Sequence, residues 1–142
     1  MPDKISVILV DDQQLIRESW KSMLNGDSRF RVVAQCVNGA EAVIECDNLR
    51  ADVILLNINR PALEGYWETE DLIKITAGKV IAVSDHSAPR YVRQMIDAGV
   101  SGFITKSSPF EELKTAIVQV HEGERYICEE VRNSTEFTER LV

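Results

Sequence analysis

The sequence predicts an α/β fold, in which one doubly wound parallel sheet of five strands is covered by helices on both faces. Short apolar runs without polar alternation recur along the 142 residues, and such runs are typical of strands buried on both faces. Segments with helical periodicity separate them, so the chain alternates strand and helix five times. This alternation implies parallel strands joined by right-handed crossovers.

The first half of the chain contains three of the expected strands and two helices. Each helix has apolar residues at spacings of three or four, and a glycine follows the first helix as its stop signal. The expected strands are Ile5–Val10, Arg31–Val37 and Asp52–Leu56; the expected helices are Gln13–Asn25, with Ile16, Trp20 and Met23 inward, and Ala40–Leu49, with Val43 and Ile44 inward.

The second half contributes two more strands and three helices. Pro89 favours a helix start, because its missing N–H costs nothing in a first turn. The expected elements are a weakly periodic helix within Tyr66–Thr76, strand Lys79–Ser84, a helix from Pro89 to Gly99, strand Gly102–Thr105 and helix Pro109–His121. We therefore expect one domain at residues 1–122. Residues 123–142 are expected to be a C-terminal extension, acting as a linker, a fraying end or the cut edge of a longer protein.

Composition narrows the classes of function. The net charge is −7 with no basic stripe, which makes direct DNA binding by this domain unfavourable. No apolar run reaches the length of a membrane span, and the N-terminus lacks the pattern of a signal peptide. The three cysteines have no metal-type spacing and are expected to be reduced thiols. We expect a cytoplasmic protein without membrane contact.

Polar residues stand where several of the expected strands end. Asp11 and Asp12 follow the first strand, Asn57 ends the central strand, Ser84 ends the fourth, and Lys106 follows the fifth. Because the carboxyl ends of parallel strands meet at one edge of the sheet, these side chains are expected to converge there. Taken singly, each of these residues has an ordinary structural explanation, because the same residue types are common as helix caps, in turns and as surface charges. Their joint placement indicates a functional site.

The motifs at these strand ends resemble the receiver domain of two-component response regulators. They are VILVDD (7–12), DVILLNINRPALEG (52–65), VIAVS (80–84) and GFITK (102–106). The resemblance extends over about residues 4–121, and implies a flavodoxin-like fold with strand order 2-1-3-4-5. GERYICEEV (123–131) also resembles the end of receivers that precede a helix-turn-helix DNA-binding domain, as in LuxR/NarL-type regulators.

The resemblance implies a phosphorylation switch that depends on Mg²⁺. Asp11, Asp12 and the backbone carbonyl of Asn59 match the metal ligands, and hard oxygen ligands suit this ion. Ser84 matches the hydroxyl that binds a phosphoryl oxygen, Phe103 the aromatic that moves inward on activation, and Lys106 the ammonium that neutralises the phosphate. The implied partners are a sensor histidine kinase and a second copy, bound through the face with Phe103 and the last helix.

Asn57 stands at the position where the family has its phosphoacceptor aspartate. A carboxylate attacks phosphorus as an anionic nucleophile, and the neutral amide of Asn57 cannot form the acyl phosphate. Loss of a charged ligand also predicts weak Mg²⁺ binding. The asparagine is either natural, giving a degenerate receiver, or engineered to block the switch.

Two further departures favour the natural origin. Arg60 replaces the methionine common in such loops, and Asp85 replaces a small residue, adding bulk and negative charge at the phosphoryl site. We hypothesise that Arg60 or Lys106 pairs with an acid of this pocket; the alternative is that Arg60 and Asp85 both point to solvent.

These departures favour a degenerate, non-enzymatic receiver that acts by protein contacts in transcription regulation. A conventional receiver with a mutated acceptor, or one using Ser84 or Asp85 instead, is the alternative. A flavin or nucleotide binder is disfavoured, because the acidic loop after the first strand has no phosphate-binding glycines. Aspartyl-phosphatase chemistry is disfavoured as well, because Gln13 stands where a second acid is needed.

Overall fold

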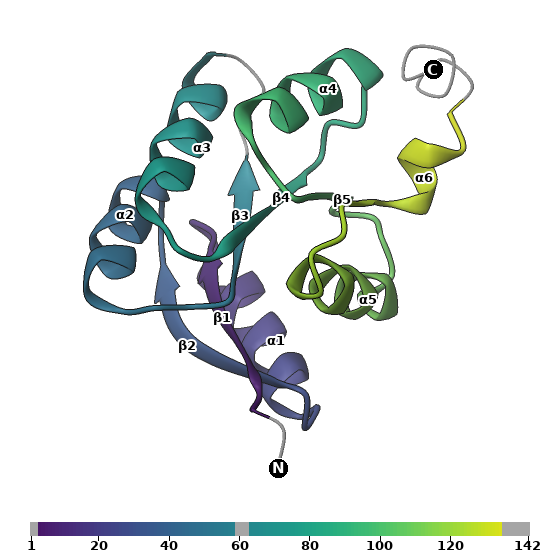
Figure 1. Cartoon of the computed structure of the whole chain (residues 1–142). Helices are drawn as coiled ribbons and strands as arrows, with labels where there is room; N and C mark the ends of the chain where they lie inside the picture. Colours follow the sequence, from purple (N-terminus) through teal and green to yellow (C-terminus); the bar gives the residue numbers. More distant parts are fainter. Residues whose placement is uncertain (1–2, 59–62, 135–142) are drawn as a thin grey trace.

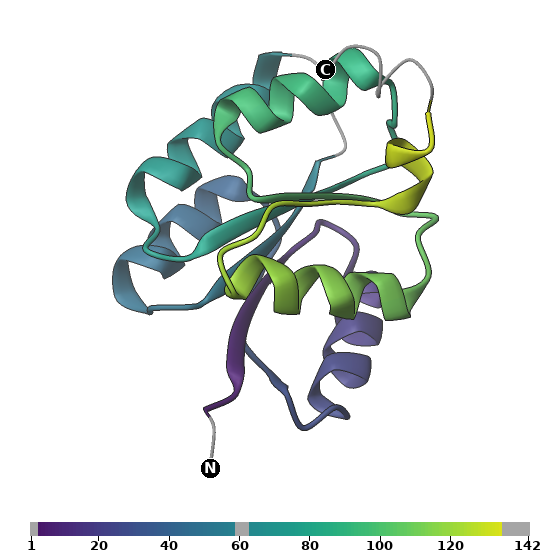
Figure 2. The same ribbon diagram turned by 45° about the vertical axis from the view of Figure 1, so that its right-hand side comes forward.

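A computed structural model describes residues 3–58 and 63–134 of the chain, with the backbone alone for residues 63–67. Its centre is a parallel sheet of six strands in the order β2-β1-β3-β4-β5-β6. Helices α2, α3 and α4 cover one face of this sheet, and α1 and α5 cover the other (Figures 1 and 2). The arrangement confirms the predicted doubly wound α/β fold.

The strands follow the apolar runs closely. The structure has β1 at Ile5–Val10, β2 at Phe30–Cys36, β3 at Val53–Ile58, β4 at Lys79–Ser84, β5 at Gly102–Thr105 and β6 at Tyr126–Ile127. The order of the first five strands agrees with the predicted 2-1-3-4-5. The prediction of five strands is wrong, because β6 pairs with the outer side of β5. A strand of two residues has no periodicity that a sequence pattern could reveal.

The helices were also anticipated, except for the last. They are α1 at Gln14–Asn25, α2 at Gly39–Asn48, α3 at Leu63–Ile75, α4 at Pro89–Ala98, α5 at Phe110–His121 and α6 at Glu129–Arg132. α4 begins at its proline as predicted and is capped by the following Gly99, whose φ of 110° lies in the left-handed region that glycine tolerates.

Two helices are rotated relative to the predicted inward faces. In α1, Met23 is 40% exposed, whereas Leu24 is fully buried, because Leu24 lies one full turn after the partly buried Trp20. In α2, Ile44 is 62% exposed, and the buried position belongs to Ala42. Both errors arise because neighbouring apolar residues leave the phase of a short helix undetermined.

The end of the described chain belongs to the fold. Tyr126, Ile127, Cys128 and Val131 are buried, and they join the same apolar core as the five central strands. Part of the expected C-terminal extension is therefore packed against β5 and α5. Residues 135–142 lie outside the described residues, so the role of that tail as a linker stays a prediction.

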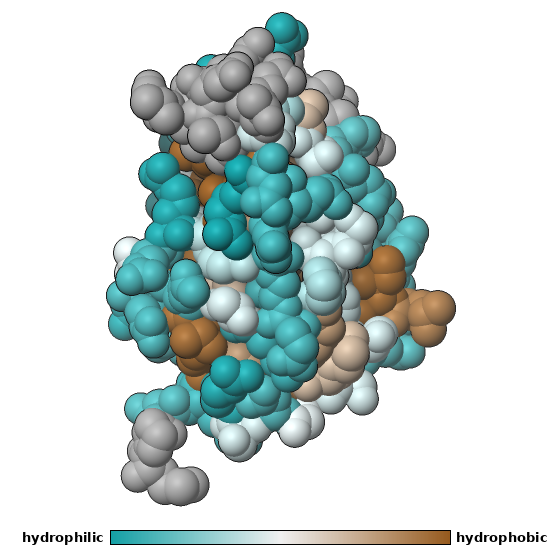
Figure 3. Space-filling model, turned by 90° about the vertical axis from the view of Figure 1, so that its right-hand side faces the viewer, coloured by the Kyte–Doolittle hydropathy of each residue, from teal (hydrophilic) through white to brown (hydrophobic). Residues whose placement is uncertain are grey.

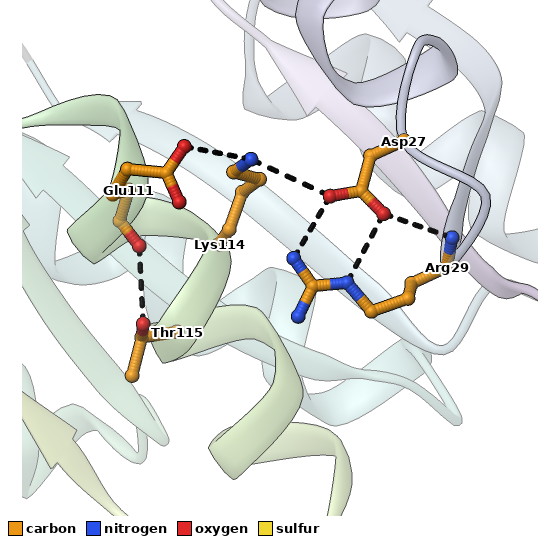
Figure 4. A network of polar contacts seen from close by, with 5 residues as sticks. All are labelled: Asp27, Arg29, Glu111, Lys114 and Thr115. Carbon is orange, nitrogen blue, oxygen red and sulfur yellow. Dashed lines mark hydrogen bonds and ion pairs between the residues drawn. The ribbon is translucent and has the colours of Figure 1, made fainter.

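An ion-pair network joins the loop after α1 to α5 (Figure 4). Asp27 accepts two hydrogen bonds from the Arg29 guanidinium, at 3.0 and 2.8 Å. Lys114 Nζ lies 3.4 Å from Asp27 Oδ2 and 2.8 Å from Glu111 Oε1. Arg29 holds the pKa of the Asp27 carboxyl well below its usual range, and Lys114 acts in the same direction. The network therefore holds the loop after α1 against α5.

Candidate functional site

The strand register brings the predicted site residues to one edge of the sheet. β1 pairs with β3 up to the residue before Asn57, and Asp11 directly follows the last paired residue of β1. Ser84 ends β4 and pairs with the residue before Lys106. Asp11, Asn57, Ser84 and Lys106 therefore lie at the carboxyl edge, as the sequence predicted. The roles assigned to them by resemblance stay predictions.

Asp11 is the most buried acid of this edge, with 1% of its surface exposed. Its Oδ1 accepts a hydrogen bond from the Gln13 backbone N–H at 2.9 Å, and Arg17 Nη1 donates to its backbone carbonyl at 2.6 Å. Its Oδ2 is buried and has no hydrogen-bond donor among the described residues. A buried carboxylate oxygen without a donor is an unsatisfied acceptor, and a cation would satisfy it.

The electrostatics of Asp11 fit such a cation. Burial raises the pKa of its carboxyl, and the nearby Asp12 carboxyl raises it further. The Gln13 N–H and the Lys106 ammonium act against this rise. Two adjacent carboxylates in a partly dehydrated place repel each other, and a divalent cation between them removes that repulsion.

Lys106 lies beside two residues from the end of β4. Its Nζ is 3.7 Å from Asp85 Oδ2, with the lysine side chain 18% exposed and that of the aspartate 67% exposed. Its backbone N–H donates to the Ser84 carbonyl at 2.9 Å. Lys106 therefore lies within ion-pair distance of Asp85, an acid whose side chain is itself largely exposed to solvent. Arg60 lies outside the described residues, as does Asn59, so their predicted contacts are untested.

Ser84 is fully buried, and its hydroxyl already has a backbone partner. The His86 backbone N–H donates to Ser84 Oγ at 3.0 Å, which shapes the loop that leads from β4 to α4. The sequence analysis noted that residues of this type are common in turns, and the interaction fits such a role for Ser84. A serine hydroxyl can also donate one hydrogen bond, and the Tyr91 phenol is a neighbour that the Ser84 hydroxyl influences.

Phe103 points inward. It is fully buried, and its ring meets the ring of Tyr91 edge-to-face at 6.0 Å and 79°. Tyr91 in turn meets His86 at 6.0 Å and 75°, and burial raises the pKa of its phenol, against the influence of Ser84. The sequence analysis predicted the helix from Pro89 to Gly99 but did not single out Tyr91 or its position between Ser84 and Phe103. The only available signal was a tyrosine early in the helix that follows Ser84.

Asn57 completes the edge between these groups. Its side chain is partly buried, and its Oδ1 is shielded from solvent. Among residues 3–58 and 63–134, no group of three or more His, Cys, Asp or Glu side chains could hold a metal ion. The available donor set is therefore two carboxylates with an amide beside them. Such a set of oxygens suits Mg²⁺ chemically but provides less charge than three acids.

The comparison with protein families agrees with this geometry. Residues 7–118 match the family described as the response regulator receiver domain. The chain belongs to this family. The match starts two residues into β1, includes β2 to β5 and the whole carboxyl edge described above, and ends within α5.

Several curated relatives are response regulators. The chain is 35% identical over 133 residues to the transcriptional regulatory protein DegU of Brevibacillus brevis, covering 93% of this receiver and 56% of the relative. It is 34% identical over 127 residues to the transcriptional regulatory protein DesR of Bacillus subtilis, covering 89% of this receiver and 63% of the relative. The chain thus spans between about half and two thirds of the relatives that it matches.

Solved structures support the same fold. A two-component response regulator of the LuxR family from Aurantimonas sp. SI85-9A1 has a TM-score of 0.87 and 24% identity, with 98% of this receiver and 99% of that chain covered. The receiver domain of the putative response regulator NarL from Mycobacterium tuberculosis has a TM-score of 0.78 and 27% identity, with 87% and 100% covered. No helix among the described residues of this receiver is long and apolar enough to cross a membrane.

Proposed function

We propose that this receiver acts by protein contacts, in the cytoplasm and without enzymatic activity, and that residue 57 is not phosphorylated. The supporting observation is the pair of Lys106 and Asp85, 3.7 Å apart. Lys106 is the ammonium that the resemblance assigns to the phosphate. A carboxylate of the chain itself lies beside it, so the positive charge that would attract a phosphoryl group is partly offset.

The chemistry of residue 57 supports the same proposal. An amide oxygen is neutral and forms no acyl phosphate, whereas the aspartate expected at this position would. Phe103 already occupies an inward position against Tyr91. In the proposed state, the arrangement associated with activation is therefore held by packing and by an internal carboxylate, with no covalent step.

Magnesium fits the remaining acids, and weak binding is proposed. Asp11 and Asp12 would hold the ion, with the buried Oδ2 of Asp11 as one ligand atom. When bound, Mg²⁺ supplies positive charge that offsets the repulsion of the two carboxylates. The ion would then support the shape of the edge, because Asn57 offers no charged third ligand.

The partners are proposed from the family and from the surface of this chain. Homologous response regulators named as transcriptional regulators suggest that the parent protein controls transcription together with a sensor histidine kinase. The homodimer face was expected to include Phe103. Because Phe103 is fully buried and β6 lies beside β5, a dimer on this side would meet α4, α5 and the β6–α6 segment instead.

Intact mass after incubation with acetyl phosphate and Mg²⁺ tests the proposal. We expect no added phosphoryl group on the wild-type chain, and Asn57→Ala serves as a control with the same expectation. A phosphoryl group on the wild type, mapped to Ser84 or Asp85, would contradict the proposal in favour of a receiver with a moved acceptor.

The variant Asn57→Asp addresses the remaining alternative. If the edge has lost only its nucleophile, this single change restores full phosphorylation, and a conventional receiver with a mutated acceptor is the better description. If Asp85 also opposes the phosphate, Asn57→Asp is modified slowly, and adding Asp85→Ala accelerates it. The proposed function predicts this second result.

A further inference from the structure

The β6–α6 segment, Tyr126–Arg132, lies along the outer edge of β5. Its backbone is bonded to that strand and to the residue before it: Tyr126 N–H donates to the Ser101 carbonyl at 3.0 Å, and Cys128 N–H donates to the Phe103 carbonyl at 2.9 Å. Figures 1 and 2 show the segment crossing from the end of α5 along β5 toward the side of α4. It therefore covers the strand that would otherwise be the edge of the sheet.

One carboxylate on α5 holds the start of the segment. Glu112 Oε2 accepts a hydrogen bond from the Tyr126 hydroxyl at 2.7 Å and another from the Glu129 backbone N–H at 2.7 Å. These bonds fix β6 and the first turn of α6 to the same atom. Hydrogen bonds to a charged acceptor are short and comparatively strong, so Glu112 is the main polar attachment of the segment to α5.

A second attachment reaches the loop that carries Lys106. Ser107 Oγ donates to Glu130 Oε1 at 3.0 Å. Ser107 Oγ also lies 3.2 Å from Thr105 Oγ1, which in turn lies 3.0 Å from Ser108 Oγ. Thr105 and Ser107 are the two neighbours of Lys106 in sequence. A continuous chain of hydroxyls therefore joins the residue at the site edge to α6.

The segment has the properties of a part that opens locally. Its ladder with β5 is two residues long, and α6, with four residues, is too short to persist without its contacts. Residues 121–125, which lead into it, are all exposed, and Gly123 has a φ of 99° that leaves a bend there. A short ladder, next to a short helix and an exposed connecting segment, places a region at the low-stability end of a fold.

The apolar side chains of the segment face the core. Cys128 is fully buried and Val131 is 1% exposed. The side of the molecule with α4, α6 and α5 is accordingly mostly hydrophilic, with separate small hydrophobic patches (Figure 3). Opening would uncover these side chains, together with the unpaired N–H and C=O groups of the β5 edge.

We propose that residues 126–132 form a releasable strap over the edge of β5, and that the loop carrying Lys106 controls its release through Ser107 and Glu130. Contacts at the carboxyl edge that move this loop then change the accessibility of β5. The inference goes beyond the proposed function, because it does not depend on the chemistry of residue 57.

Cys128 provides the readout, since it is a buried free thiol on the strap. The full chain is treated with iodoacetamide, and labelling of each cysteine is followed by peptide mass mapping. Cys36, buried at the opposite edge of the sheet on β2, reports opening of the whole fold in the same sample. In the wild type we expect Cys128 to react faster than Cys36 and more slowly than the partly buried Cys46.

Two variants test the attachments without removing packing. Tyr126→Phe deletes one bond to Glu112, and Ser107→Ala deletes the link from the loop to α6. Each should raise the labelling rate of Cys128 by roughly threefold to tenfold, the value expected for one hydrogen bond, with Cys36 unchanged. Ser28→Ala, at an exposed serine after α1, should change neither rate.

Three results would overturn the proposal. If Ser107→Ala leaves the Cys128 rate unchanged while Tyr126→Phe raises it, the loop does not control the strap. If neither variant changes the rate, the bonds do not hold the strap. If Cys36 accelerates in parallel with Cys128, the segment opens only with the whole fold, and there is no releasable strap.

Discussion

Lys106 and Asp85 form an ion pair across two neighbouring strand ends, with 3.7 Å between Nζ and Oδ2. The lysine is mostly buried, whereas the aspartate is largely exposed. The pair is therefore asymmetric: desolvation affects the ammonium more than its partner. The pair affects its surroundings as well. Asp85 partly offsets the positive charge of Lys106, and the same lysine lowers the pKa of Asp11.

The first prediction concerns the strength of this pair. Because Asp85 is 67% exposed, water and salt screen the attraction, and the coupling is expected to be about 0.2–1 kcal/mol. A double-mutant cycle with Asp85→Ala, Lys106→Ala and both together, followed by urea denaturation, measures it. The coupling should shrink further at high salt. A coupling free energy well above this range would show that the pair is less exposed to water in solution than it is in the structure.

The second prediction concerns magnesium. Asn57→Asp adds a charged oxygen beside Asp11 and Asp12, and should strengthen Mg²⁺ binding by roughly tenfold or more. Trp20 is a suitable fluorescent reporter, because it lines a pocket of about 100 Å³ together with Lys106. Asp47→Asn, which removes an exposed acid near the end of α2, is the control and should leave the affinity unchanged. Equal affinity of the wild type and Asn57→Asp would refute the prediction.

The third prediction concerns Tyr126. Burial first, and Glu112 second, raise the pKa of its phenol from 10.0 to about 12. The folded state therefore keeps a proton that the unfolded state loses. The resulting stabilisation is complete below pH 10 and is lost as the pH rises from 10 to about 12.

An absorbance titration of tyrosinate checks this. Tyr126→Phe should remove the component that titrates near 12, and Glu112→Gln should shift that component downward while keeping it. If Tyr126 ionises near 10.0 in the wild type, its hydroxyl does not bind Glu112 in solution.

The strands and the carboxyl edge could be predicted because their signals are local. A buried parallel strand is a run of apolar residues, so β4 and β5 were placed with their observed ends. A polar residue at the end of such a run lies at the edge by geometry alone. Asp11, Asn57, Ser84 and Lys106 needed no further information.

Other features depend on contacts between distant segments and left no such signal. β6 forms because Tyr126 and Ile127 pair with β5, and a segment of two residues is too short to have a hydrophobic periodicity. The bond from Ser107 to Glu130 joins residues 23 positions apart. The contact of Tyr91 with Phe103 likewise depends on how α4 lies on the sheet. Side-chain pairings of this kind follow from packing, which a single sequence does not display.

The last prediction concerns how the stability of the fold changes at low pH. It depends on the network of Asp27, Arg29 and Lys114 shown in Figure 4. Arg29 is the main cause that lowers the pKa of Asp27 below the ordinary 3.8. A lowered pKa means that the unfolded state binds the proton more readily, so the network stabilises the fold above pH 3.8 and loses that effect as the pH falls further.

Asp27→Asn should therefore lower the urea midpoint at neutral pH, and its difference from the wild type should decrease in acid. Glu111→Gln, at a side chain that is 82% exposed, is the control and should have a smaller effect. A deficit of Asp27→Asn that stays constant down to acid pH would show that the carboxylate charge of Asp27 contributes nothing to holding α5 against the loop after α1.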